Sequence, residues 1–136
     1  MKVQFALLAD AANKTDSGKL NLLGVFDRIN ARQFPALHPS GTLVMRLVFS
    51  TLETGKEHGI RIVLVDEDGK ELMAQEGKLN LGPRKGPDAY ADMIVPLMPM
   101  PFPTAGNYQL RILVDESDLF SVSLLLQTIE EKSKND

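Results

Sequence analysis

One stretch decides the fold class: it reads FPTAGNYQLRILVD and runs from Phe102 to Asp115. A turn at Gly106 opens its second half, in which every second position carries an apolar side chain. These positions are Tyr108, Leu110, Ile112 and Val114. Such alternation is typical of a strand that buries one face against a second sheet. The stretch therefore predicts packed β-sheets.

Seven further strands are expected on the same grounds, each ended by residues that favour turns. They cover residues 3–9, 19–30, 42–52, 60–66, 70–79, 89–97 and 120–127. A helix is the alternative for the first of them, because residues 6–12 are rich in good helix formers. Two proline-rich segments, 34–41 and 98–103, are expected to be irregular, and the second is expected to cross between the sheets. The pattern predicts an all-β, eight-stranded antiparallel β-sandwich.

The tripeptide Gly106-Asn107-Tyr108 resembles the corner of many immunoglobulin-like sandwiches, in which a tyrosine near a strand start caps upstream backbone with its hydroxyl. We expect Tyr108 to be largely buried, with its hydroxyl bonded to nearby backbone. The chain departs from antibody domains because Leu110 stands where a core cysteine would fall, and it contains no tryptophan. The topology is therefore expected to be immunoglobulin-like or C2-like.

Length and composition narrow the class of protein. A chain of 136 residues fits one domain, expected over residues 1–128 with a polar tail at 129–136. The absence of cysteine excludes disulfides and thiolate chemistry, and it suits a reducing compartment. The first ten residues resemble a signal peptide, but Gln4 interrupts the apolar run and Asp10 closes it. We therefore expect a cytoplasmic protein.

Charge and hydropathy exclude two kinds of partner. The 15 basic and 18 acidic residues are mixed along the chain and give a net charge of −3. Nothing forms the basic face that binding to a phosphate backbone needs. No apolar run is long enough to span a bilayer. We expect neither nucleic acid nor a membrane as partner.

Two stretches, Phe5–Asn13 (FALLADAAN) and Gly18–Asp27 (GKLNLLGVFD), resemble a family of small bacterial proteins of unknown function. The resemblance continues through the Phe34-Pro35 and His38-Pro39 dipeptides and the hairpin at Asp66. It implies a bacterial source and no particular activity.

The segment Asp66-Glu67-Asp68-Gly69 invites a calcium interpretation, because carboxylates alternate ahead of a glycine. A calcium loop of the helix–loop–helix type needs a glutamate at its twelfth position, where this chain has Gly77. A hairpin turn with Gly69 at positive φ is therefore expected instead. A C2-type site would need carboxylates from several loops to meet, and the candidates are Asp16, Asp66, Asp68, Asp115, Glu116 and Asp118. We expect no metal and no cofactor, with calcium-dependent binding as the second alternative function.

The only histidines are His38 and His58, and each lies beside a turn-forming residue. Hydrolytic or zinc chemistry needs a base with a positioned partner or three clustered ligands, and neither is visible. Both are expected to be loop residues, and no catalytic residue is predicted. The first alternative function is a hydrolase or ligand-binding enzyme that uses loop carboxylates and His38. The loop at residues 82–87 is a weak candidate for an anion site, because its prolines remove backbone donors.

Apolar side chains occupy many positions that should face outward. They are Leu8, Leu23, Val25, Ile29, Val44, Val48, Val63, Val65, Ile94, Leu113 and Leu125. An outer sheet face of this character is expected to be covered by a second copy or a protein partner. The segment 98–103 is a second candidate contact, unless it only plugs the end of the sandwich. The expected function is a non-enzymatic interaction or assembly module, with a possible interface at Val44, Val48, Met98, Met100 and Phe102.

Overall fold

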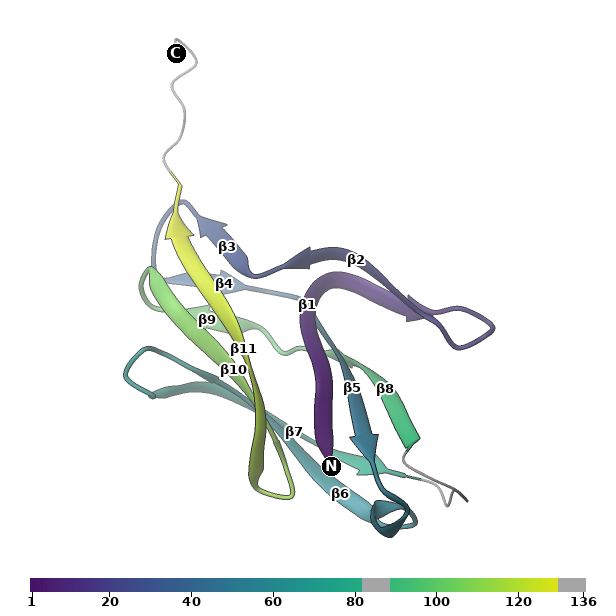
Figure 1. Ribbon diagram of the computed structural model, residues 1–136. Coiled ribbons are helices and arrows are strands. Elements are labelled where there is room, and N and C mark those ends of the chain that lie inside the picture. Colours follow the sequence, from purple (N-terminus) through teal and green to yellow (C-terminus); the bar gives the residue numbers. More distant parts are fainter. Residues whose placement is uncertain (82–88, 130–136) are drawn as a thin grey trace.

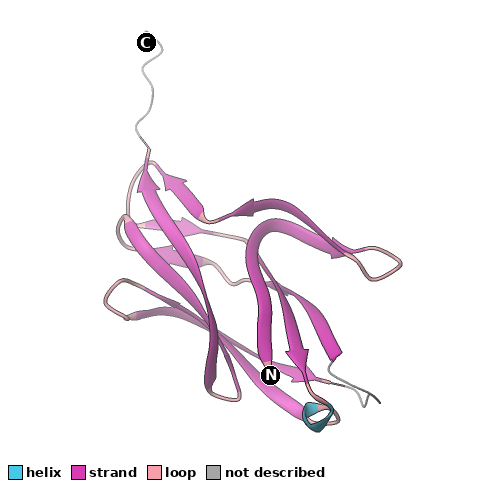
Figure 2. Ribbon diagram, in the orientation of Figure 1, coloured by secondary structure: helices cyan, strands magenta, loops and turns pink. Residues whose placement is uncertain are grey.

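The computed structural model describes residues 1–81 and 89–129, and within these ranges it is all-β. It contains eleven strands and one short 3₁₀ turn, Thr51–Glu53, and no α-helix occurs in the described ranges (Figures 1 and 2). The expected loop at 82–87 and the expected tail beyond Ile129 lie outside the described residues.

Two large sheets carry nine of the strands. The four-stranded sheet is antiparallel, in the order β2 (Leu20–Phe26), β1 (Lys2–Lys14), β5 (Thr42–Phe49) and β8 (Ala89–Pro96). The five-stranded sheet has the order β3 (Arg28–Ala31), β11 (Ser117–Thr128), β10 (Gly106–Val114), β6 (Glu57–Val65) and β7 (Glu71–Asn80). In it, β3 runs parallel to β11 and the other neighbours are antiparallel. A two-stranded sheet pairs β4 (Ala36–His38) with β9 (Met100–Phe102).

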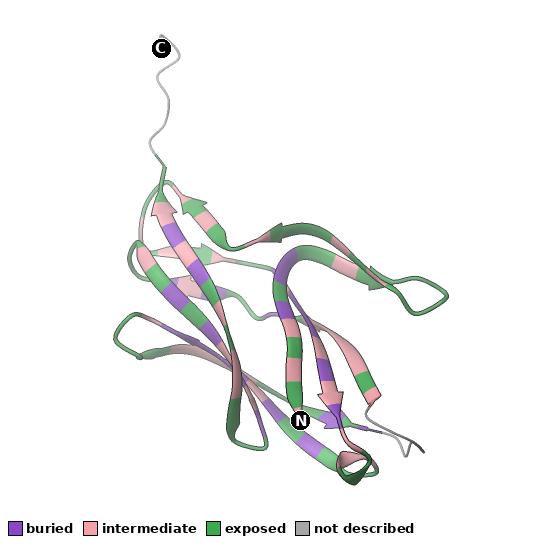
Figure 3. Cartoon of the chain, viewed as in Figure 1, coloured by how far each residue is buried: buried purple, intermediate pink, exposed green. Residues whose placement is uncertain are grey.

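The hydrophobic core takes buried side chains from strands of both large sheets, and along these strands buried and more exposed residues often alternate (Figure 3). The predicted facing of the strand after Gly106 is confirmed, since its four apolar positions are all buried and Arg111 stays partly exposed. The largest fully buried side chains are Phe102, Leu8, Leu43, Met45, Leu47, Ile62, Leu64, Met100, Leu110, Ile112, Leu124 and Leu126.

The expected hydrogen bond at the start of this strand is also present. The buried Tyr108 donates its hydroxyl to the carbonyl oxygen of Thr104 at 2.6 Å and accepts the Thr104 N–H at 3.3 Å. Its ring meets that of Phe102 edge to face, with 4.9 Å between centroids. The turn ahead of β10 is thus tied to the core through one side chain.

The expectation of eight strands is wrong, because three short strands were not anticipated. The segment 19–30 breaks at Asp27 into β2 and β3, which belong to different sheets. The two proline-rich segments are not irregular throughout, since each contributes one strand of three residues to the two-stranded sheet. Both strands of such a sheet are edges, so Pro101 is tolerated despite its missing N–H.

The helical alternative for the first segment is wrong, and so is the expected facing of that strand. A register shift between Val3 and Phe5 reverses the alternation, as an extra residue in one strand does. Leu8, expected outward, is therefore in the core, whereas Leu7 is exposed.

Beyond the core, β1 and β2 continue as a hairpin arm (residues 10–25) that projects from the rest of the protein (Figure 1). Gly24 has a φ of 69°, and a side chain there would run into the carboxylate of Asp10, so the arm needs glycine at this point. Near the tip, Lys14 Nζ donates to the backbone oxygen of Asp92 at 2.9 Å. Because Asp92 is on β8, this bond holds the tip of the arm close to the opposite edge strand of the sheet.

Candidate functional site

The most elaborate polar arrangement in the described residues centres on His58, which lies in β6 and not in a loop as expected. Its ring is buried, with 6% of the residue exposed. Nδ1 lies 2.6 Å from Oδ2 of Asp115, and Nε2 lies 2.8 Å from the backbone oxygen of Glu53. Both oxygens are acceptors, so beside an ionised Asp115 only the doubly protonated imidazolium makes both hydrogen bonds.

Asp115 is positioned by the two-residue turn between β10 and β11. It and Glu116 have positive φ values of 49° and 69°, as in hairpin turns that match the strand twist. The backbone N–H of Asp115 donates to the Gly59 oxygen at 2.9 Å, and Oδ1 accepts the Gly59 N–H at 3.0 Å. The turn is therefore held to the start of β6 by backbone as well as by His58.

Glu53, whose backbone oxygen bonds to the His58 ring, also makes contacts through its side chain. Its carboxylate accepts the Ser50 N–H at 2.9 Å and lies 2.8 Å from the ammonium of Met1. The pKa of Glu53 is lowered first by that ammonium and then by the Ser50 N–H. The His58 cluster (His58, Asp115, Glu53 and Met1) thus joins four separate segments of the chain.

These hydrogen bonds shift the pKa values of His58 and Asp115 in opposite directions. The pKa of His58 is raised, because the bond to the Asp115 carboxylate and then the bond to the Glu53 carbonyl favour the imidazolium. The pKa of Asp115 is lowered by His58 and then by the Gly59 N–H. With both ring nitrogens engaged, His58 has no lone pair to offer a substrate. The hydrogen bonds and ion pairs of the cluster therefore hold its four segments of the chain together.

We expect the His58 cluster to give the protein a pH-dependent stability. The His58 contribution is fully present below the pKa of a free histidine, about 6.5, and is lost as pH rises through the raised folded value. The Asp115 contribution is fully present above about 3.9, the pKa of a free aspartate, and is lost as pH falls through the lowered folded value. Melting temperatures measured across this range should therefore be highest between these limits and decline toward alkaline pH.

The control is His58→Gln, which should abolish most of the alkaline decline. Imidazole NMR gives a second readout, because the pKa of His38 is lowered by partial burial, against a smaller opposing effect of Asp10. The two histidines should therefore titrate on opposite sides of the free value. An unchanged alkaline decline of the melting temperature in His58→Gln would contradict the assignment of that decline to His58.

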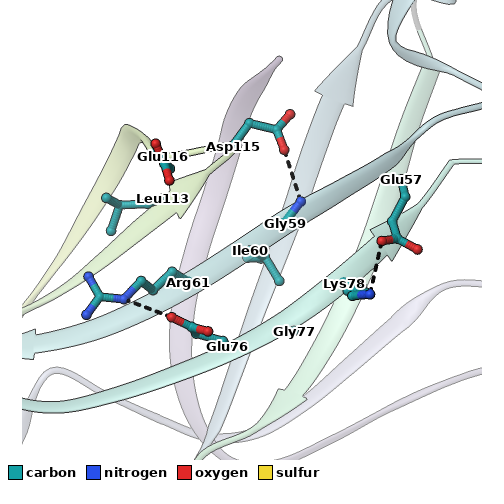
Figure 4. A pocket seen from close by; sticks show the side chains of 10 residues that line it. All are labelled: Glu57, Gly59, Ile60, Arg61, Glu76, Gly77, Lys78, Leu113, Asp115 and Glu116. Atoms are coloured by element: carbon teal, nitrogen blue, oxygen red, sulfur yellow. Dashed lines mark hydrogen bonds and ion pairs between the residues drawn. The ribbon is translucent and has the colours of Figure 1, made fainter.

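A groove of about 810 Å³ lies beside this cluster at the end of the five-stranded sheet (Figure 4). Gly59 and Gly77 leave backbone exposed in it, and Leu113 adds an apolar wall. Two ion pairs occupy its rim, Lys78 with Glu57 at 3.2 Å and Arg61 with Glu76 at 3.4 Å. The cations of the groove are thus already neutralised by carboxylates.

The loop carboxylates considered for calcium do not come together. Asp66 and Asp68 lie in the turn after β6, whereas Asp115 bonds near the start of β6, so the two turns are at opposite ends of the sheet. Across residues 1–81 and 89–129, no group of three His, Asp or Glu side chains is placed to hold a metal ion. Asp66 instead accepts the N–H groups of Asp68 and Lys70 at 2.9 and 2.8 Å, and Gly69 has a φ of 81°. The expected hairpin turn is confirmed.

His38 lies in β4, half-buried against the ring of Phe26, with 5.6 Å between centroids. Asp10 influences it electrostatically, but no hydrogen bond joins the two within the described residues. His38 and Asp10 therefore do not form the hydrogen-bonded pair that a catalytic base needs.

The five expected interface residues have different environments. Val44, Met100 and Phe102 are buried, the last two in the core, so the expectation that they form an exposed contact is wrong. Val48 is partly exposed, and Met98 is 51% exposed. Of the eleven apolar residues expected to face outward, only Leu23 and Val25 are exposed, and both are on the arm.

The chain matches a protein family over residues 4–127, from near the start of β1 to near the end of β11. That family is described as a family of unknown function (DUF6941). The chain belongs to it. The match takes in the arm, both large sheets and the His58–Asp115 pair, so the family resemblance expected from the first 27 residues is confirmed over most of the chain. A bacterial source stays a prediction.

No curated protein matches the chain. Within the described ranges, no helix has the length and apolar character that crossing a membrane requires.

Proposed function

We propose that this member of the family is a non-enzymatic assembly module that self-associates through its arm. One observation carries the proposal: Leu23 and Val25 occupy alternate positions of β2 and are 65% and 55% exposed. In the register with β1, Leu23 lies opposite Ala11, which is also exposed, so three apolar residues share one exposed face of the arm. An apolar face of this kind is a candidate surface for protein contact.

The scaffold supports this role. We infer that the two large sheets form an immunoglobulin-like sandwich, a view supported by the hydrogen bond from Tyr108 to Thr104. The hydrophobic core includes none of residues 10–25, so the exposed face of the arm can make a contact without uncovering the core. A cytoplasmic location, and a role without catalysis, remain predictions.

The test is the mass of the protein in solution. Sedimentation at micromolar concentration should give a dimer, and Leu23→Lys combined with Val25→Lys should give a monomer with unchanged circular dichroism, because charges cannot be buried unpaired at the contact. The matched control is Leu52→Lys, a residue 84% exposed in the 3₁₀ turn, which should leave the dimer intact. A wild-type protein that is monomeric at every concentration would remove self-association as its role.

A further inference from the structure

The four edge strands of the large sheets differ in how they are protected against pairing. β3 carries Arg28, β7 carries two glutamates and a lysine, and β8 carries Asp92 and ends at Pro96. Charges and prolines of this kind prevent edge strands from pairing with another chain. β2, with the sequence LNLLGVF, has neither a charge nor a proline. It is the one edge of the large sheets without these protections in the described residues.

The backbone of β2 is also available on its outer side. Its residues pair with β1 from Phe26 opposite Leu8 to Leu20 opposite Lys14. Within the described residues, no backbone hydrogen bond joins the seven residues of β2 to any segment other than β1. A strand beside it would pair these N–H and C=O groups.

We propose that β2 pairs antiparallel with β2 of a second copy about a two-fold axis at Gly24, which joins two four-stranded sheets into one. This inference rests on the proposed self-association and names its surface. With the axis at Gly24, Leu23 lies opposite Val25 of the second copy, and Leu22 lies opposite Phe26. Every apolar side chain beside the axis then meets an apolar one.

A second copy is the occupant that the side chains of β2 favour. The net charge of −3 opposes the association of two copies, so a contact between them has to form where no charge is present. β2 brings no charge to the contact, and an isologous pairing repeats its apolar matches on both sides of the axis. A two-fold axis at Leu23 would instead place Val25 opposite Asn21 of the second copy, so an apolar side chain would meet a polar one.

The chain contains no cysteine, so single cysteines report the pairing directly. Residues directly opposite in an antiparallel pair have Cα atoms about 4.5–5.5 Å apart, within the range of a disulfide, whereas diagonal neighbours are about 7–8 Å apart. A mixture of Leu23→Cys and Val25→Cys protein should therefore form a mixed disulfide dimer on oxidation. Each variant alone should cross-link far less, and Leu52→Cys, alone or mixed, should not cross-link.

Hydrogen exchange on the unmodified protein provides a second measurement. Raising the concentration should slow exchange at residues 20–26 and leave β8 unchanged. A dimer by mass without cross-linking or protection at β2 would overturn this inference and leave the proposed function standing. Efficient cross-linking of Leu23→Cys alone would overturn the axis at Gly24. A monomeric wild type would overturn both proposals.

Discussion

Replacing Phe102 with alanine should lower the free energy of unfolding by about 3–5 kcal/mol, the usual cost of removing a buried aromatic ring. The side chain is almost fully buried and packs edge to face on Tyr108, so its loss leaves a cavity next to the turn that opens β10. Urea denaturation followed by circular dichroism measures the difference. A loss of this size would be a large share of the stability of a domain this long.

The matched control is Met98→Ala in the same proline-rich segment. Met98 is exposed, so its replacement should lower the free energy of unfolding by no more than about 0.5 kcal/mol, as is usual at exposed positions. A small loss at Phe102 would mean that the segment does not plug the core. Similar losses at both positions would mean that Met98 is covered in solution.

Replacing Leu110 with alanine should lower the free energy of unfolding by about 2–5 kcal/mol, because the residue is completely buried in the hydrophobic core. Arg111 is its neighbour in sequence and faces the other way, partly exposed beside Val63 of β6. Arg111→Ala should cost less than about 1 kcal/mol, mostly through lost contact of its aliphatic stem. Equal losses at the two positions would show that both faces of β10 are buried in solution.

The parts of the fold that sequence could predict are those governed by local alternation and turn chemistry. β10 shows this, since its facing and the bond from Tyr108 follow from the chain within a few residues. The hairpin at Asp66 is similar, because an aspartate and a glycine favour that turn in any sheet.

The parts that it could not predict depend on distant residues. A shift of one residue in β1 reversed the facing of Leu8, and no local signal marks the shift. β4 and β9 form only because two proline-rich segments far apart in sequence lie side by side. Their short runs between prolines have no alternation to detect.

The His58 cluster was missed for the same reason. His58 and Asp115 are 57 positions apart, and each lies beside residues that are common in loops. The exposure of Leu23 and Val25 agrees with the expectation, whereas Val44, expected on an outer face, is buried between its neighbours on β1 and β8. Burial of an outward position depends on neighbouring strands, which the sequence of one strand does not describe.

The parallel pair of β3 and β11 has a consequence for synthesis on the ribosome. Arg28 is made early and lies opposite Leu125, which is among the last of the described residues to be made. A nascent chain can therefore pair β1 with β2, but β3 has no partner strand until β11 has emerged. During that time Ile29 of β3, which packs against the core in the complete fold, is uncovered. Translation that stalls before β11 should therefore yield chains prone to aggregation.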